Sequence, residues 1–162
     1  PCDYVKQRDI EVVLSEMAEQ VAIRMRREHQ KATIVSVVVT YSKTEMKQPI
    51  NTQMKIEPTN QTRLLTDTVL TLFRKKYTSG AVRGIAVNYS GFVDESYALI
   101  SLFDDVEATE KEENLQRTID HIRDQFGFLA VQKGTALLDS SRNIARSKLI
   151  GGHSAGGLEG LQ

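Results

Sequence analysis

The side chains of this sequence that could carry out chemistry are a run of acids, three histidines and a glycine-rich segment. Six acids lie between Asp104 and Glu113 and could bind a metal or transfer protons, but such a run at the start of a helical pattern is typical of a solvated helix surface. His29, His121 and His153 do not have the mutual spacing of metal ligands. The segment "GGHSAGG" lacks the lysine and the following helix of a phosphate-binding loop. The sequence therefore predicts no catalytic centre.

Length and composition indicate one domain with an appendage. The chain has 162 residues, of which 40% are hydrophobic, enough for a packed domain of about 100 residues and a further segment. Its 21 basic and 21 acidic residues cancel, so the net charge favours neither a nucleic acid nor a membrane as partner. A binding face must therefore be found from the positions of particular side chains.

The expected location of the protein is the cytoplasm. Cys2 is the single cysteine, which excludes an internal disulfide and favours a reducing compartment. No apolar run approaches the roughly 18 residues of a membrane span, and acids at positions 3, 9 and 11 occupy the place of an apolar signal peptide. Pro1 as the first residue indicates a piece of a longer chain.

Periodic apolar positions predict the elements of the first part of the chain. Apolar residues spaced by three and four predict a helix from Asp9, its expected N-cap, to about residue 29. Alternation predicts strands over residues 33–42 and 49–58, which are expected to form a hairpin. A second helix is expected from a cap at Thr59 to about residue 77, followed by a strand over residues 82–92.

The order helix, strand, strand, helix, strand predicts an α+β fold of the ferredoxin-like kind that lacks its first strand. In that fold both helices cover one face of the sheet, and the missing strand would leave a vacant position inside it. The uncovered face is the candidate binding surface, although solvation alone also explains its polarity. Its polar positions are Ser36, Thr40, Ser42, Asn51, Gln53, Lys55 and Asn88.

Four stretches of the sequence, "VVVTYSK", "TQMKIEPTNQT", "IAVNYSGF" and "SRNIARSKLIGGHSAGGL", resemble the C-terminal part of the Y-family translesion DNA polymerases. The similarity is greatest to the UmuC-like lesion-bypass proteins of the ImpB/MucB/SamB group, the UV-damage repair proteins of Gram-positive bacteria. It covers nearly the whole chain. The resemblance implies a little finger domain in residues 1–93, a linker in residues 94–106, and a helical, glycine-rich C-terminal tail in residues 107–162.

In this family the little finger lays its open sheet in the major groove of primer–template DNA and contacts phosphates without reading the base sequence. The resemblance implies that this segment binds DNA and is not itself an enzyme, since the carboxylates and Mg²⁺ of the polymerase belong to a palm domain outside this sequence. No cofactor is expected here. The implied DNA-binding residues are Ser36, Thr40, Ser42, Asn51, Gln53, Lys55, Arg83 and Asn88. Relatives often carry further arginines near Gly84 and one at the position of Thr52, so weak affinity is expected.

The resemblance also gives a role to the stretch "LISLF" in the linker. Bacterial lesion-bypass polymerases carry a short apolar peptide that inserts into a pocket of the sliding clamp, and this stretch is similar to it with leucine in place of the usual first glutamine. An edge strand that fills a gap in the sheet is the alternative interpretation. The implied clamp-binding residues are Leu99, Ile100, Ser101, Leu102 and Phe103.

The tail has no fixed role in the family. Residues 107–126 predict an amphipathic helix that needs a partner surface, and a basic segment containing Arg142, Arg146 and Lys148 follows it. A solvated basic helix is one interpretation of that segment. The functional interpretations are that it braces the little finger, contacts DNA, or contacts the recombinase filament that activates UmuC-like enzymes in the SOS response.

Two other classes of function remain as alternatives. An RNA-binding module is disfavoured because Tyr41 and Tyr89 fall on the helix-covered side, where they cannot stack on bases. A dimerising module is the other alternative. Filling of the vacant strand position by residues 97–103, within one molecule or in a homodimer, is expected under the ferredoxin-like order.

Overall fold

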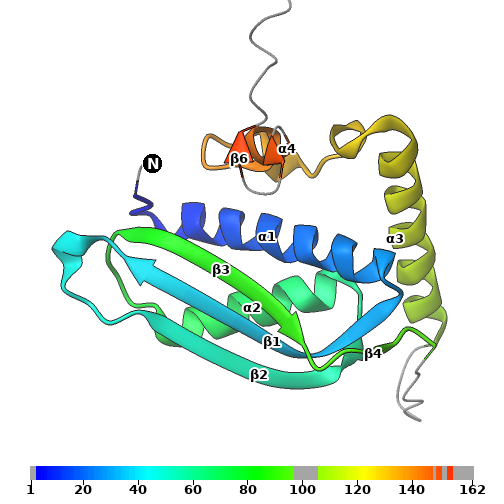
Figure 1. Ribbon diagram of the computed structural model, residues 1–162, viewed down its shortest axis with the longest axis horizontal. Helices are drawn as coiled ribbons and strands as arrows, with labels where there is room; N and C mark the ends of the chain where they lie inside the picture. Colours follow the sequence, from blue (N-terminus) through cyan, green and yellow to red (C-terminus); the bar gives the residue numbers. More distant parts are fainter. Residues whose placement is uncertain (1–2, 97–105, 148, 151–152, 155–162) are drawn as a thin grey trace, which may run out of the picture.

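The computed structural model describes residues 3–96, 106–147, 149–150 and 153–154 (Figure 1). Residues 3–96 form a body with the predicted order of elements, and residues 106–147 form an arm. The body contains α1 (Gln7–Arg27), β1 (Gln30–Tyr41), a 3-10 turn (Lys43–Glu45), β2 (Ile50–Thr59), α2 (Thr62–Lys76), β3 (Val82–Ser90) and β4 (Val93–Asp94). The arm contains α3 (Val106–Phe126), 3-10 turns (Phe128–Ala130 and Gly134–Leu137) and α4 (Asn143–Ser147), before β5 (Leu149–Ile150) and β6 (His153–Ser154).

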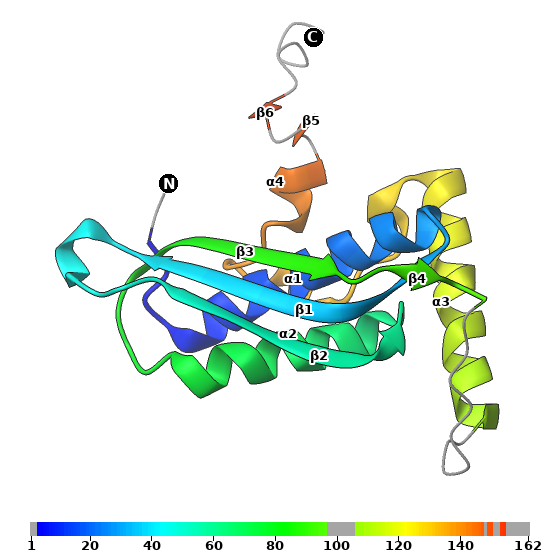
Figure 2. The ribbon, with the colours of Figure 1, turned by 60° about the horizontal axis from the view of Figure 1, so that its bottom comes forward.

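The sheet of the body is antiparallel, with the order β2-β1-β3. β1 is the central strand, and β4 pairs with its first two residues. α1 and α2 lie side by side against one face of this sheet (Figure 2). The fold is thus α+β and compatible with the ferredoxin-like little finger that the sequence predicts.

The expectation of a vacant strand position inside the sheet is wrong. β1 and β3 are direct neighbours from the pair Ile34–Ser90 to the pair Tyr41–Val82, so no strand fits between them. Tyr4 pairs with Val82 on the side of β3 that faces away from β1, through N–O distances of 2.9 and 2.8 Å. The structure therefore gives no reason to expect a homodimer in which a second molecule fills an interior gap of the sheet. Residues 97–103, which were expected to fill it, lie outside the described residues.

The core lies between the two helices and the sheet. Residues four apart on each helix face the sheet, and alternate residues of β1 meet them, as the apolar periodicity predicts. Burial of these side chains supplies the main driving force for folding of the body. The fully buried members with the largest side chains are Phe73, Ile10, Leu14, Leu65, Val35, Val37, Val39, Val69 and Val82.

Neither predicted N-cap is correct. The N-cap of α1 is Lys6, three residues before the expected Asp9, and it makes no side-chain hydrogen bond, so Asp9 lies within the first turn. Asp9 is still favourably placed for the positive end of the helix dipole. Thr59 ends β2, and its hydroxyl accepts the Gln61 N–H at 3.1 Å, which orders the turn before α2.

Both tyrosines that the alternation assigns to the covered face are found there. Tyr89 is buried, and its hydroxyl donates to the Ala18 carbonyl at 2.9 Å. Burial raises the pKa of Tyr89 well above its ordinary value of 10.0. Tyr41 packs against the core and stacks on Tyr77, with 6.4 Å between ring centroids. Neither ring is available on the opposite face for stacking on bases.

β2 is an edge strand of the sheet. Its partner on one side is β1, and no described strand pairs with its other side. Pro58 lies within β2 and has no N–H to donate, which an edge strand tolerates because only one side is paired.

The arm lies against the side of α1 that faces away from the sheet. In Figure 1, α3 passes the C-terminal end of α1, and the chain then returns along α1 to α4. The helix predicted over residues 107–126 is confirmed, but its apolar stripe is only partly covered: Leu115 is 54% and Phe126 75% exposed, whereas Ile119 and Ile122 are half-buried. Polar contacts therefore make up an important part of the attachment of the arm. None of the helices in the described part of the chain combines the length and apolarity that a membrane crossing requires.

Candidate nucleic-acid interface

The face of the sheet away from α1 and α2, called the open face below, is built from four rows of side chains. Directly paired residues of antiparallel strands point to the same side, so three rows run across β2, β1 and β3 and the fourth across β1 and β3. The rows are Lys55–Ile34–Ser90, Gln53–Ser36–Asn88, Asn51–Val38–Ala86 and Thr40–Gly84.

Six of the eight predicted DNA-binding residues lie together on the open face. The alternation in three separate segments of the sequence therefore assembles a single surface, and Lys55 is the one charged residue in its rows. The other five side chains carry hydroxyl or amide groups, which can donate hydrogen bonds to phosphate oxygens. That they bind DNA stays a prediction. The six are Ser36, Thr40, Asn51, Gln53, Lys55 and Asn88.

The other two predicted residues, Ser42 and Arg83, have an acidic partner. Arg83 Nη1 lies 3.0 Å from Asp3 Oδ1, and its side chain is 52% exposed. Ser42, just beyond β1, also hydrogen-bonds Asp3. The bond from Arg83, and then that from Ser42, lowers the pKa of the Asp3 carboxyl below its usual range. Asp3 therefore carries a negative charge that offsets part of the attraction of Arg83 for a phosphate.

The open face also carries apolar side chains, which the predicted residue set did not include. Ile34 and Val38, both on the central strand β1, occupy the centre of two rows, and Ala86 on β3 lies next to Val38. They can contact the apolar faces of sugars without hydrogen bonds. The signal for them was present in the sequence, because they lie two positions from Ser36 and Asn88 in the same alternation.

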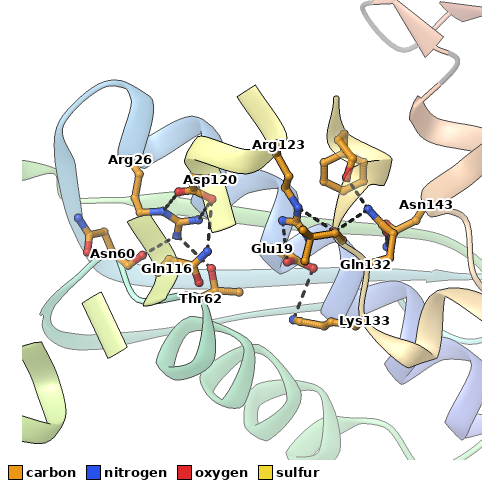
Figure 3. Close-up of polar contacts among 12 residues, drawn as sticks. Glu19, Arg26, Asn60, Thr62, Gln116, Asp120, Arg123, Gln132, Lys133 and Asn143 are labelled. Atoms are coloured by element: carbon orange, nitrogen blue, oxygen red, sulfur yellow. Dashed lines mark hydrogen bonds and ion pairs between the residues drawn. The ribbon is translucent and has the colours of Figure 1, made fainter. Parts of the chain in front are cut away.

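A second polar cluster joins the arm to the body (Figure 3). At the end of α1, Arg26 donates from Nε and Nη2 to the two carboxylate oxygens of Asp120, at 2.6 and 3.1 Å. Its Nη1 donates to the Asn60 carbonyl at 2.9 Å and to the Thr62 hydroxyl at 3.0 Å. One guanidinium thus ties α3 to α1 and to the turn between β2 and α2.

Beside it, Glu19 of α1 holds two cations of the arm (Figure 3). Arg123 Nη1 lies 3.0 Å from Glu19 Oε1, and these side chains are only 5% and 7% exposed. Arg123 also donates to the Val131 carbonyl at 3.0 and 2.8 Å and lies over the Phe128 ring, 4.8 Å from its centroid. Lys133 Nζ approaches Glu19 Oε2 at 3.4 Å. Further polar contacts thus compensate for the burial of this pair, which a buried ion pair requires to be tolerated.

Glu16, one turn earlier on α1, receives the basic segment of the tail. It accepts the Arg142 backbone N–H at 2.8 Å and the Ser141 hydroxyl, and Arg146 Nη1 lies 3.9 Å away. Burial lowers the pKa of Arg146. The basic side chains of this segment are only partly solvated: Arg146 lies near Glu16, and Arg142 Nε donates to the Tyr4 hydroxyl at 2.6 Å. Lys148 lies outside the described residues. Of the functional interpretations, bracing of the little finger is the one that these contacts support.

The sequence held a signal for this attachment. Val12, Glu16, Glu19 and Ile23 are buried at spacings of four, three and four, so they form a second helical stripe beside the one that packs on the sheet. Two acids within a buried stripe require buried cationic partners. The identity of the partner could not be derived, because Arg123 is 104 residues from Glu19.

An open groove of about 450 Å³ lies between α2, α3 and Val131–Lys133, and its wall carries both signs of charge. Within the described ranges, no group of three or more His, Cys, Asp or Glu side chains is placed to hold a metal ion.

Comparison with known proteins decides the family. Residues 1–102 match the model of the impB/mucB/samB family C-terminal domain. The chain belongs to this family. The family predicted from the sequence motifs is thereby confirmed.

Curated relatives of this impB/mucB/samB domain match over most of the chain. DNA polymerase IV 2 of Halalkalibacterium halodurans is 32% identical over 154 residues, which cover 94% of this chain and 37% of the relative. A Bacillus subtilis protein named for UV-damage repair, UvrX, is 30% identical over 154 residues, covering 94% and 36%. DNA polymerase IV 2 of Bacillus subtilis is 30% identical over 155 residues, covering 94% and 37%. The chain spans just over a third of the length of these relatives.

The family model and the alignments with the relatives cover different lengths of this chain. The family model ends at residue 102, before α3, whereas an alignment over 94% of the chain must include most of the arm. The region aligned with the relatives therefore includes most of the arm. The predicted clamp-binding residues, Leu99 to Phe103, lie outside the described residues, and their role stays a prediction.

Proposed function

We propose that this chain is the DNA-binding C-terminal part of a Y-family lesion-bypass DNA polymerase, and that its open face holds the primer–template duplex. One observation carries the proposal: in a chain of the impB/mucB/samB family, three strands direct short hydrogen-bonding side chains to the same uncovered face in register. Two curated relatives are named DNA polymerase IV 2, and a third is named for UV-damage repair.

The contacts of the open face suit an enzyme that must copy any template. Hydroxyl and amide groups that meet phosphate oxygens position the duplex without reading its sequence. With Lys55 as the one charged residue in the rows, little affinity comes from the release of counterions. Binding by the chain alone is then weak, and attachment to the rest of a polymerase raises the effective concentration of DNA at this face.

The proposal assigns no catalysis to this chain. Nucleotide transfer, and the Mg²⁺ ions that support it, belong to other domains of the parent polymerase, in the cytoplasm where the DNA is copied. Recruitment to the sliding clamp is part of the proposal, with Leu99 to Phe103 as the docking peptide. Contact of the tail with a recombinase filament in the SOS response is a further part.

The test of the DNA face is a salt titration of duplex binding, with the full chain and a fluorescein-labelled primer–template duplex. Lys55→Ala should flatten the slope of log affinity against log salt by about 0.9, the value for one phosphate contact. Lys111→Ala, an exposed lysine of α3, is the matched control and should leave the slope unchanged. Equal slopes for Lys55→Ala and the unaltered chain would reject the open face.

The clamp peptide needs a separate test. Replacing both Leu102 and Phe103 with alanine should abolish binding to a bacterial sliding clamp in surface plasmon resonance, because a docking peptide depends on its apolar anchors. The melting temperature should stay within a few degrees, since such a peptide is not part of the core. A large drop in melting temperature would instead support the edge-strand interpretation.

A further inference from the structure

The hairpin between β1 and β2 is fixed in place by the loop that joins α2 to β3. The Ser42 N–H donates to the Ala81 carbonyl at 2.8 Å, and the Glu45 carboxylate accepts the Ala81 N–H at 2.7 Å. Lys47 Nζ donates to the Ser79 carbonyl at 2.7 Å and to the Ser79 hydroxyl at 2.9 Å. Residues on both sides of the hairpin tip are thus anchored to the body.

Gly80 permits this anchoring. Its φ of +114° lies in the region that glycine adopts readily. A Cβ at this position would lie 2.9 Å from Glu45 Oε2 and 3.1 Å from Lys47 Nζ. The anchored conformation of the hairpin therefore depends on the absence of a side chain at position 80.

Met46 sits between the two anchors, Glu45 and Lys47, and points into solvent. It is 96% exposed, and its backbone is left-handed, with φ 49° and ψ 30°. Methionine is unfavourable at this position for two reasons. A residue with a Cβ is disfavoured in the left-handed conformation, and an exposed apolar side chain loses the stabilisation that burial would give. Asparagine or glycine would remove both costs. The stability of the fold therefore does not explain a methionine at this position.

We propose that the hairpin tip, residues 43–46, is a further contact with the DNA duplex, in which Met46 packs on a deoxyribose and Lys43 pairs with the neighbouring phosphate. This inference rests on the proposed function. The tip continues the two strands that carry Thr40 and Asn51 on the open face, so a duplex on that face lies next to it. Lys43 is exposed and forms no ion pair with any other described residue.

The side chains of the tip suit a nucleic-acid backbone better than a protein surface that is only apolar or only charged. The backbone alternates apolar sugars with anionic phosphates, and the tip presents an apolar side chain and a cation three residues apart. An anchored tip also loses little conformational entropy when it binds. Met46 would add contact area that does not depend on salt, whereas Lys43 would add to the salt dependence.

The test compares variants of the full chain in the same duplex titration. Met46→Asn should weaken binding about fivefold through the lost apolar contact, while its melting temperature holds or rises because asparagine accepts a left-handed backbone. Met46→Leu keeps an apolar side chain and should bind like the unaltered chain. Lys43→Gln should flatten the salt slope by about 0.9. Leu137→Asn, which changes an arm residue that is 88% exposed, is the matched control and should not change binding.

The outcomes separate this inference from the proposed function. Duplex binding that depends on Lys55 but is unchanged in Met46→Asn and Lys43→Gln would overturn the hairpin contact and leave the open face standing. Equal weakening by Met46→Asn and Met46→Leu would also overturn it, because the effect would then not follow apolar character. No duplex binding by the unaltered chain would overturn both.

Discussion

Replacement of Arg123 with methionine is expected to release the arm from α1 while the body stays folded. The side chains of Arg123 and Glu19 are 5% and 7% exposed, with Nη1 3.0 Å from Oε1. Methionine retains much of the aliphatic volume of arginine but removes the charge. Lys133, whose Nζ lies 3.4 Å from Glu19 and whose side chain is 51% exposed, is then the remaining cation near the carboxylate.

The magnitude follows from the burial of the pair. Removal of one partner from a buried ion pair costs about 3–5 kcal/mol, because the other charge stays buried without compensation. Because Lys133 stays close to Glu19, we expect the lower end of this range, about 3 kcal/mol. This corresponds to a roughly 150-fold increase in the equilibrium constant for opening of the arm. Because Glu19 regains water when the arm detaches, this cost appears as local opening of the arm and not as global unfolding.

Native-state hydrogen exchange followed by mass spectrometry is the assay. In Arg123→Met, the amides of α3 should exchange on the order of 100-fold faster, while those of β1 keep their protection. The double variant Glu19→Gln with Arg123→Met should regain part of the protection of α3, because no charge is left buried. Unchanged exchange of α3 in Arg123→Met would refute the claim that this pair holds the arm. Equal loss of protection in β1 would refute the separation of arm and body.

Two further predictions concern the body. Tyr89→Phe should lower the free energy of unfolding by about 1 kcal/mol at neutral pH, because the hydroxyl loses its bond to a carbonyl of α1. Since burial raises the pKa of Tyr89 above 10.0, the stability it confers is complete below that pH and is lost as the pH rises beyond it. The free energy of unfolding of Tyr89→Phe, measured in urea, should therefore fall less steeply with pH above 10 than that of the unaltered chain. An identical fall with pH in both proteins would contradict this. Gly84→Ala should lower the free energy of unfolding by about 1 kcal/mol, because a Cβ there would lie 2.5 Å from Thr40 Oγ1. In thermal melts, adding Thr40→Ala should restore part of the lost melting temperature. If it does not, the strain does not come from the contact with Thr40.

The sheet and its open face could be predicted because a strand has a period of two. Once Val35, Val37 and Val39 are assigned to the core, Ser36 and Thr40 must face the other way, whatever the order of the strands. The order itself could not be obtained in this way. Direct pairing of β1 with β3 depends on contacts between distant segments, and the assumption of an interior strand came from the fold class and not from these residues.

The attachment of the arm could not be predicted from local patterns. The segments that contain Arg123, Asp120 and Arg142 are as polar as a solvent-exposed surface. Only the two acids in the buried stripe of α1 indicate that cationic side chains must cover that stripe. Likewise the partner of Arg83 was missed, because Asp3 belongs to a segment without a periodic pattern. Charge pairing between distant residues has no sequence period.

The edge position of β2 has a consequence for self-association. An uncovered strand edge is a template on which a second chain can add a strand, and a flat sheet with such an edge is prone to form fibres. β2 opposes this, because Pro49 precedes it, Pro58 removes one donor, and Lys55 places a charge that a stacked copy would have to bury. In the described part of the chain, β2 therefore combines an unpaired edge with residues that oppose the addition of a strand from a second copy.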